Sequence, residues 1–317
     1  MEAKRGALSF NVPRQDRNLR LPLARSAVHH LIYYSPFTIH RLPFTMSPVS
    51  IHPTAVVSPR AEIASDALIG PYVVIEDDVV IGEGCEIASH AVIKQFTTLG
   101  RGNRIFEHAV LGGLPQDVKF EGEASRLVVG EFNIIREGVT LHRASGRARE
   151  TRIGSRNFLM IGVHIAHNCV IGDDNTFANE VALAGHIEIE DHVFLSNGVG
   201  AHQFVRMGRH AMVGGKSKIV QDVLPFFITD GNPSRVRGVN TVGLRRAGFS
   251  NEARRSLKEA YKILFRSDLP LEVALLRMAD LNDDNVDHLI SFIHASRRGF
   301  IRARGVGPTV EEEPLPV

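Results

Sequence analysis

Histidine is the side chain whose number and spacing in this sequence most suggest chemistry. Of the 317 residues, 15 are histidine, and five of those in the segment 142–202 form the candidate cluster: His142, His164, His167, His186 and His202. A neutral imidazole held by a hydrogen bond at one nitrogen can act as a general base near neutral pH. Three converging imidazoles can instead bind zinc. The spacing of His164, His167 and His186 leaves both chemistries open.

Two further segments have residues suited to binding. The string "LGGLPQDVKFEGEASR" places Asp117 and Lys119 among turn residues, which is typical of a solvated turn or of a loop that contacts a sugar or phosphate. The string "VNTVGLRRAGF" contains Asn240, Arg245 and Arg246, which can bind an anion or form a solvated linker.

The elements that position these residues follow from a repeat of six. Stepping six residues at a time from Ile51 to Ile219 visits 29 positions, and 25 of them hold Ile, Leu, Val, Met or Phe. This period matches neither an α-helix nor an alternating strand, and it is typical of a parallel β-helix whose apolar residues point inward. Glycine often follows the inward residue, as in "IG" at positions 69 and 153, where a tight corner has little room for a side chain.

The breaks in the repeat predict loops. Asp117 and Glu123 interrupt it in one stretch and Arg147 in another, so we expect loops near residues 112–128 and 143–152. Loops on a rigid scaffold are where binding residues usually lie. The long apolar faces of such a solenoid need a cover, which predicts a symmetric homo-oligomer.

The repeat ends before a helical region. Helical spacing is expected over "SNEARRSLKEAYKILF" with Ser250 as the N-cap, then over "LPLEVALLRMADL" and "VDHLISFIHASRRGFIR". We therefore divide the chain into a β-helix at residues 47–235, a helical domain at 236–304 and a disordered tail at 305–317.

The composition bounds the class of protein. The first 45 residues hold seven Arg or Lys against Glu2 and Asp16, which is typical of a transit peptide or of a start site placed upstream of Met46. We take 1–46 as a disordered or miscalled leader. The net charge of +2 and the lack of a basic motif give no sign of nucleic-acid binding. No apolar run is long enough to span a membrane, and Cys85 and Cys169 lack a CxxC spacing, so we expect a cytoplasmic protein.

Several strings together resemble a known family. In order they are "IHPTAVV", "GGLPQDVKFEGE", "IREGVTLHR", "MIGVHIAHNCVIG", "LAGHIEIEDHVFL", "AHQFVRMGRHAMVGG" and "GVNTVGLRRAGFS". They resemble the acyl-carrier-protein:UDP-N-acetylglucosamine O-acyltransferases, which begin lipid A synthesis, over residues 47–303. The resemblance implies a left-handed parallel β-helix, a homotrimer with active sites between subunits, and no cofactor or metal. It also implies transfer of a 3-hydroxyacyl group from acyl carrier protein to the 3-hydroxyl of UDP-N-acetylglucosamine.

The same resemblance implies roles for individual residues. His167 is the general base and Gly185 the backbone donor to the thioester oxygen. Gly215 occupies the position that limits acyl length. The residues implied in substrate binding are Asp117, Lys119, His142, His164, His186, His202, Gln203, Asn240 and Arg246.

Departures from the family pattern leave alternatives. Asn168 stands where some members have Asp, so an adjacent carboxylate cannot orient His167, and we expect a backbone carbonyl to do so. Val242 and Ala247 replace a Glu and an Arg, which leaves open a 3-amino sugar as acceptor. "HRAS" replaces the commoner "HRGT", which we take as a local change. Two other classes of function remain open: a zinc hydratase similar to γ-carbonic anhydrase, and a non-catalytic scaffold.

Overall fold

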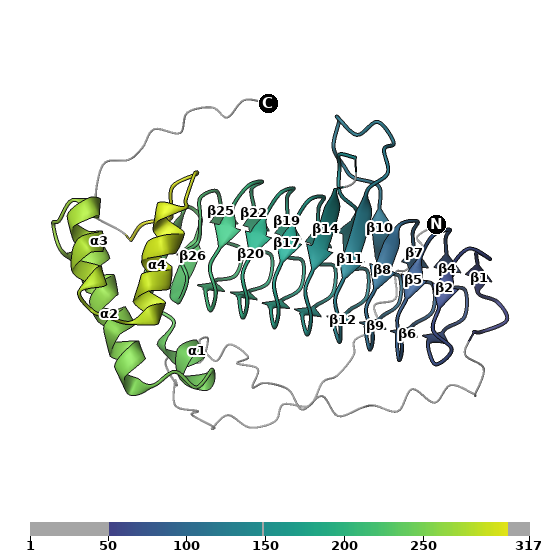
Figure 1. The fold of residues 1–317 in the computed structure, drawn as a ribbon, viewed down its shortest axis with the longest axis horizontal. Helices are drawn as coiled ribbons and strands as arrows, with labels where there is room; N and C mark the ends of the chain where they lie inside the picture. The colour runs from purple at the N-terminus through teal and green to yellow at the C-terminus, as the bar shows by residue number, and fades with distance from the viewer. Residues whose placement is uncertain (1–50, 148, 304–317) are drawn as a thin grey trace, which may run out of the picture. The chain divides into compact units, whose positions relative to one another are not determined.

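The computed structural model describes residues 51–147 and 149–303 (Figure 1). The expected leader at 1–46 and tail at 305–317 lie outside the described residues. From Ile51 the chain winds through three sheets in turn, so that each strand pairs in parallel with the strand one full coil later. His164 thus pairs with Ala182, 18 residues further on. This is the left-handed parallel β-helix that the repeat and the family resemblance predict, and helices follow it.

The strands fall into three sheets, which we number in chain order. Sheet 1 contains β1 (Val56–Val57), β4 (Val74–Ile75), β7 (Val92–Ile93), β10 (Val110–Gly113), β13 (Thr140–His142), β16 (His164–Ile165), β19 (Ala182–Leu183), β22 (Gly200–Ala201) and β25 (Lys218–Ile219). Sheet 2 contains β2 (Glu62–Ile63), β5 (Val80–Ile81), β8 (Thr97–Leu99), β11 (Arg126–Val129), β14 (Glu150–Ile153), β17 (Val170–Ile171), β20 (Glu188–Ile189) and β23 (Arg206–Met207). Sheet 3 contains β3 (Leu68–Ile69), β6 (Glu86–Ile87), β9 (Arg104–Ile105), β12 (Ile134–Ile135), β15 (Phe158–Leu159), β18 (Thr176–Phe177), β21 (Phe194–Leu195), β24 (Met212–Val213), β26 (Phe227–Gly231) and the antiparallel β27 (Ser234–Val239).

The core of the coil is built from two inward rows. The row of the six-residue repeat is buried, as with Ile165 and Leu183 at 0% exposed. A second row two residues earlier is buried as well, including Val163 and Val181. After the inward residue, glycine permits the tight corner, because a Cβ on Gly154 would lie 2.5 Å from the carbonyl oxygen of Gly172.

The corners of the coil explain much of the histidine content. Most corners place one residue at positive φ, a conformation in which Asn, Asp and His are enriched. His90, His108, His186, His192 and His210 all occupy this position. His142, His164, His167 and His202 do not, so another reason must account for these four histidines.

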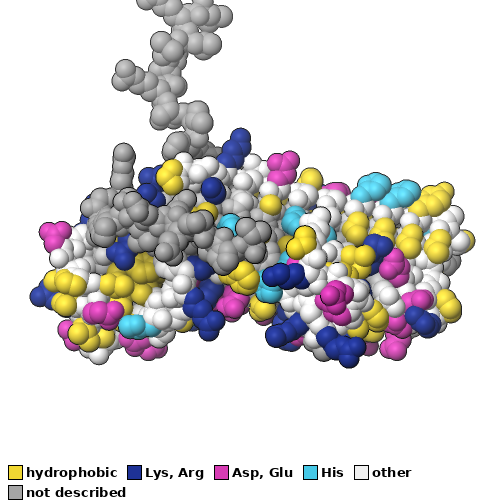
Figure 2. Space-filling view, turned by 90° about the horizontal axis from the view of Figure 1, so that it is seen from above, with side chains coloured by type: hydrophobic (Ala, Val, Ile, Leu, Met, Phe, Trp, Pro, Cys, Tyr) yellow, Lys and Arg dark blue, Asp and Glu magenta, His cyan; other side chains and the backbone are white. Residues whose placement is uncertain are grey.

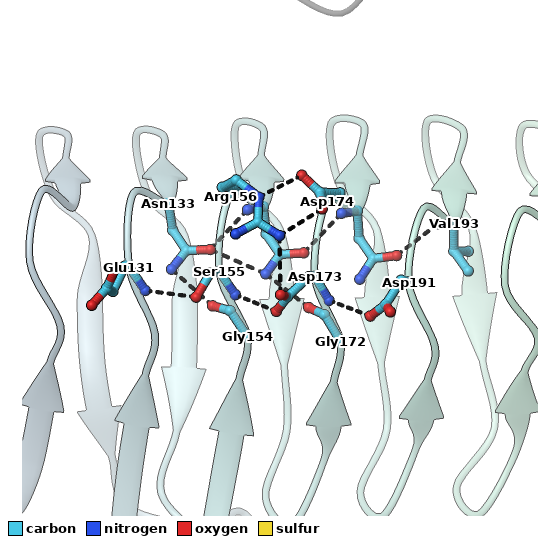
Figure 3. Close-up of polar contacts among 12 residues, drawn as sticks. Glu131, Asn133, Gly154, Ser155, Arg156, Gly172, Asp173, Asp174, Asp191 and Val193 are labelled. Carbon is cyan, nitrogen blue, oxygen red and sulfur yellow. Dashed lines mark hydrogen bonds and ion pairs between the residues drawn. The ribbon is translucent and has the colours of Figure 1, made fainter. Parts of the chain in front are cut away.

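The corner between sheets 2 and 3, called here the 2–3 corner, is held by a buried polar ladder (Figure 3). The side-chain oxygen of Asn103 accepts from the backbone N–H of Asn133, Asn133 does the same for Asn157, and Asn157 for Asn175, at 2.8–2.9 Å. On the outside, Arg156 pairs with Asp173 and Asp174 of the next coil. Because the side-chain oxygen of each asparagine is paired with a backbone N–H of the next coil, these bonds hold successive coils together at this corner.

The two loops leave the coil where the breaks in the repeat predict. The first loop (114–125) joins β10 to β11, and the second loop (143–149, with Ala148 outside the described residues) joins β13 to β14. Both therefore lie on the corner between sheets 1 and 2, called here the 1–2 corner, and the loops project from the body of the coil in Figure 1.

The helical region differs in part from the sequence prediction. Its helices are α1 (Thr241–Arg246), α2 (Asn251–Arg266), α3 (Leu271–Ala279) and α4 (Asp284–His294). Ser250 caps α2 as predicted, through its hydroxyl and the N–H of Ala253 at 3.1 Å. The third helical run was expected to continue to Arg302, which is wrong: α4 ends at His294, and Phe300 and Ala303 instead bridge to Asp222 and Val236 of the coil.

The end of the coil and the first helix also refine the expected domain limits. β27 continues to Val239 and α1 begins at Thr241, so the boundary drawn at 235/236 falls inside the last strand. The short helix α1 occupies a segment that the sequence suggested only as a binding or linker stretch. Its polar cap, Asn240, accepts from the N–H of Gly243 at 3.1 Å.

The described residues add three general observations. No helix among them is long and apolar enough to cross a membrane. Cys85 and Cys169 are both buried and free, as their spacing predicts, and burial raises the pKa of Cys169 to about 12. Figure 2 shows side chains of both charges interspersed with hydrophobic ones over the face in view.

Candidate active site

His167 lies on the 1–2 corner, directly after strand β16. Its side chain is 9% exposed, and Nδ1 lies 2.8 Å from Oδ1 of Asn168. The following residue, Asn168, has φ of 60°, which turns its side chain back toward the imidazole and away from the strand. The corner geometry thus brings two consecutive side chains into contact.

The orientation of the Asn168 amide is set by the second loop. The N–H of Ser145 donates to Oδ1 of Asn168, and Nδ2 of Asn168 donates to the carbonyl of Ser145, both at 3.0 Å. Oδ1 can only accept, so the neutral His167 must have its proton on Nδ1. Its Nε2 is then the bare acceptor nitrogen that a general base needs.

This contact corrects one expectation. A backbone carbonyl was expected to orient His167 because Asn168 has no carboxylate. The side-chain carbonyl of Asn168 takes that place instead, since an amide oxygen accepts a hydrogen bond as a carboxylate does, without its charge.

Gly185 lies against the ring of His167 from the next coil. A Cβ on Gly185 would lie 2.6 Å from Cε1 and 2.8 Å from Nε2 of His167, so only glycine fits beside the imidazole. Within the described residues its N–H makes no hydrogen bond, while its carbonyl accepts from the N–H of Phe204 at 3.2 Å. An unpaired N–H beside the base is suited to stabilise a developing oxyanion.

Three other histidines line the same corner and the adjoining face of sheet 1. The rings of His142 and His164 meet edge to face at 5.0 Å, and those of His167 and His186 at 5.3 Å. His164 is held by Thr140, whose Oγ1 lies 2.8 Å from its Nδ1. Burial lowers the pKa of His142, of His164 and of His186, and neighbouring histidines lower it further for His142 and His186, so all three are neutral at pH 7.

The arrangement of these imidazoles bears on the zinc alternative. Across residues 51–147 and 149–303, no group of three or more His, Cys, Asp or Glu side chains is placed to hold a metal ion. His164, His167 and His186, which the spacing left open as a ligand set, therefore do not converge on one point.

Asp117 and Lys119 lie on the first loop, above the same corner. The N–H of Lys119 donates to the Asp117 carboxylate at 3.0 Å, and this bond lowers the pKa of Asp117 most, followed by the Ser145 hydroxyl. The positive charge that His167 carries when protonated lowers it further. Asp117 is thus ionised and near the base. Lys119 is exposed, which leaves its ammonium group available to a ligand.

The remaining predicted residues are distributed over all three corners. His202 and Gln203 lie on the 1–2 corner one coil beyond Gly185, and the two contact each other through His202 Nδ1 and the Gln203 carbonyl at 3.3 Å. Gly215 lies on the corner between sheets 3 and 1. Asn240 is bonded to the carbonyl of His210 on the 2–3 corner at 3.0 Å, and the exposed Arg246 ends helix α1. One chain therefore does not bring Asn240 and Arg246 to the His167 corner.

Sequence reasoning missed the residues that support His167. Ser145 and Thr151 hold Asn168, the latter by accepting its N–H at 2.8 Å, and Glu123 accepts the N–H of Gly146 at 2.5 Å. The only signal was indirect: Glu123 and the "HRAS" string lie in the two breaks of the repeat, which mark loops that emerge at the same corner.

Comparison with family models agrees with both regions of the chain. Residues 60–95 and 150–185 match the bacterial transferase hexapeptide model, described as six repeats. Residues 222–301 match the model described as UDP-N-acetylglucosamine O-acyltransferase, domain 2.

Known proteins resemble the chain over three quarters or more of their own length. An acyl-[acyl-carrier-protein]–UDP-N-acetylglucosamine O-acyltransferase of Verminephrobacter eiseniae is 44% identical, over 80% of this chain and 99% of the relative. One of Gloeothece citriformis is 48% identical, over 65% of this chain and 76% of the relative. The solved structure of the UDP-N-acetylglucosamine O-acyltransferase of Moraxella catarrhalis aligns with a TM-score of 0.78 at 42% identity, over 80% of this chain and 100% of that chain.

Proposed function

Since the chain belongs to the family of acyl-[acyl-carrier-protein]–UDP-N-acetylglucosamine O-acyltransferases, we propose that it catalyses the reaction of that family. A 3-hydroxyacyl group passes from the thioester of acyl carrier protein to the 3-hydroxyl of UDP-N-acetylglucosamine. This transfer is the first step of lipid A biosynthesis and requires no cofactor. The observation that carries the proposal is the contact between His167 Nδ1 and the fixed amide oxygen of Asn168, which leaves Nε2 free to accept a proton.

His167 acts as the general base. Its Nε2 removes the proton of the sugar 3-hydroxyl while that oxygen attacks the thioester carbonyl. The C–S bond then breaks, and the proton held by His167 passes to the departing sulfur. The new ester bond replaces the thioester, and no covalent bond to the enzyme is formed.

Gly185 stabilises the charge that develops in this step. As the carbonyl carbon becomes tetrahedral, its oxygen becomes negative, and a preorganised N–H then contributes more than it does to the ground state. The unpaired N–H of Gly185, beside the imidazole, is suited to this role.

Substrate binding is assigned to residues around this centre. Asp117 and Lys119 bind the sugar and phosphate from the first loop. The imidazoles and the amide assigned to binding hydroxyl and amide groups of the substrates are those of His142, His164, His186, His202 and Gln203.

The nucleotide and the acyl chain are assigned to the other two corners. Asn240 fixes the start of α1, and this helix presents Arg246 to the nucleotide. Gly215 limits acyl length: a Cβ there would already contact the carbonyl oxygen of Asn197 at 3.4 Å, so a longer side chain would take up space that glycine leaves to the acyl chain.

A homotrimer is the assembly that unites these corners. His167 lies on the 1–2 corner, Gly215 lies on the corner between sheets 3 and 1, and Asn240 is bonded to His210 of the 2–3 corner. We infer that neighbouring chains complete each site. The tip of the first loop supports this, because the side chain of Val118 is 101% exposed and Leu114 is 59% exposed, which favours a partner surface there. We place the protein in the cytoplasm, where both substrates are made.

Product analysis tests the proposed reaction. The full chain is incubated with UDP-N-acetylglucosamine and a panel of 3-hydroxyacyl carrier proteins, and the nucleotide-sugar product is identified by mass spectrometry. We expect UDP-3-O-(3-hydroxyacyl)-N-acetylglucosamine, with the ester cleaved by mild alkali. Transfer only to a 3-amino analogue, or stoichiometric zinc that is lost together with activity, contradicts the proposal.

A further inference from the structure

The two loops on the 1–2 corner are joined to each other by an acidic side chain of the first loop. One carboxylate oxygen of Glu123 accepts the N–H of Gly146 at 2.5 Å, and the other accepts the N–H of Glu121 at 2.9 Å. The first loop therefore holds the peptide between Ser145 and Gly146 of the second loop through Glu123.

A buried arginine adds to the junction of the loops. Arg143, at the start of the second loop, is 6% exposed, and its guanidinium lies 5.2 Å from the ring centre of Phe96 and 5.5 Å from that of Phe120 on the first loop. Glu123 and Glu76 compensate its charge at longer range. Such a stacked guanidinium stabilises the loops' mutual position.

The second loop links the position of the first loop to the orientation of His167. Ser145 bonds the Asn168 amide with both its N–H and its carbonyl, and the same amide oxygen holds Nδ1 of His167. A tilt of the Ser145 peptide would tilt the Asn168 amide, and with it the imidazole. A displacement of about 1 Å at a reacting group can reduce the rate about a hundredfold.

We propose that Glu123 is a positioning residue for catalysis, which holds the Ser145–Gly146 peptide so that Asn168 keeps His167 in its working orientation. The loop that presents Asp117 and Lys119 to the sugar thus also fixes the base. This inference rests on the proposed acyl transfer. It assigns Glu123 no contact with substrate, only an effect through Ser145 and Asn168.

A double-mutant cycle tests the path from Glu123 to the base. Glu123→Ala and Asn168→Ala are each expected to lower kcat ten- to a hundredfold with little change in the KM for UDP-N-acetylglucosamine. If Glu123 acts through Asn168, the double variant is no slower than Asn168→Ala, because the path is already broken. Multiplicative losses would overturn the proposal.

The matched control is Glu121→Ala on the same loop. Only the backbone N–H of Glu121 takes part in the junction, so we expect kcat within about twofold of the unaltered chain. Glu123→Gln, which keeps one acceptor oxygen, should recover part of the activity lost in Glu123→Ala, and its failure to exceed Glu123→Ala would contradict the positioning role.

The pH profile gives a readout that a merely structural residue would not move. The amide oxygen of Asn168 accepts from Nδ1–H of His167 and thereby favours the imidazolium form. If Glu123→Ala loosens this contact, the acidic limb of kcat/KM should shift to lower pH, in the same direction as in Asn168→Ala. The ionisable groups that face His167 are Asp117, His142 and His186, all retained in these variants. If the acidic limb of kcat/KM does not shift in Glu123→Ala, the positioning role of Glu123 is contradicted. Lack of transfer by the unaltered chain would instead refute the proposed function.

Discussion

The 1–2 corner and the 2–3 corner have the same kind of backbone turn, but their side chains make different contacts. Both place a residue at positive φ, Asn168 on one and Asp174 on the other. At the 2–3 corner the side chains bond to the next coil, as in the asparagine ladder of Figure 3, and thereby hold the coils together. At the 1–2 corner Asn168 bonds to its neighbour His167 and to the second loop.

The difference shows how a solenoid acquires a site without changing its coil. Polar groups that are satisfied by the next coil add stability, whereas an imidazole bonded at one nitrogen only keeps the other for a ligand. The second loop changes the hydrogen-bond partner of the corner asparagine. Asn168 bonds to Ser145 of that loop, whereas an asparagine of the ladder bonds to a residue of the next coil. Variants at the two corners should therefore separate activity from stability.

Apart from replacement of His167 itself, the largest effect on activity should come from Gly185→Ala. The added methyl group would lie within 2.6–2.8 Å of the His167 ring, which must move, and we expect kcat to fall about a hundredfold or more. Gly200→Ala on sheet 1 is the matched control, since no described atom lies within 4 Å of its Cβ position. Equal kcat values for the two variants would show that Gly185 is not part of the centre.

A charge change at Asn168 should move the pH profile. In Asn168→Asp a carboxylate lies next to the imidazole, favours its protonated form and raises the pKa of the base by about one unit or more. The base is inactive when protonated, so the acidic limb of kcat/KM should shift to higher pH by that amount. An unshifted limb would indicate that Asn168 does not contact the group that titrates in catalysis.

At the 2–3 corner the expected loss is in stability. Asn133→Ala removes the amide that bonds Asn103, Asn157 and the carbonyl of Gly154, and it leaves buried partners unsatisfied. We expect a loss of about 2–4 kcal/mol, seen as a lower Tm at fixed protein concentration, with kcat of the folded enzyme within about twofold. A large fall in kcat with unchanged Tm would contradict the division between the corners.

The smallest effect on rate is expected at the corner between sheets 3 and 1. Gly215→Met adds a long side chain at a position where a Cβ is in ordinary van der Waals contact with the Asn197 carbonyl oxygen. It should therefore shift the preferred donor to shorter acyl chains, while kcat on the shortest donor stays within about threefold. Competition between 3-hydroxyacyl carrier proteins of different length measures this shift. The prediction fails if the order of preference is unchanged.

Much of the architecture follows from the sequence because the repeat is local. The six-residue period predicts the coil, its breaks predict both loops, and the Ser250 cap predicts the start of α2. The resemblance singles out His167, and the structure places it beside Gly185, with Asp117 near it.

What could not be predicted depends on contacts between distant segments. The amide of Asn168 orients His167 only because the second loop turns it, and neither neighbour in sequence indicates this. The asparagines of the ladder lie buried in the second inward row of the coil, although their polar side chains would suggest exposed positions. The segment after His294 has apolar residues at helical spacing, yet its bonds go to Asp222 and Val236 of the coil.

The most direct test of the central claim compares two histidines on the two corners. His167→Asn and His192→Asn are each assayed for transfer from a 3-hydroxyacyl carrier protein to UDP-N-acetylglucosamine, with product measured by mass spectrometry. His192 occupies a positive-φ corner position that Asn also tolerates. We expect His167→Asn to lose about 10²–10⁴-fold in kcat and His192→Asn to stay within about twofold. Retained transfer in folded His167→Asn would contradict the assignment of His167 as the base.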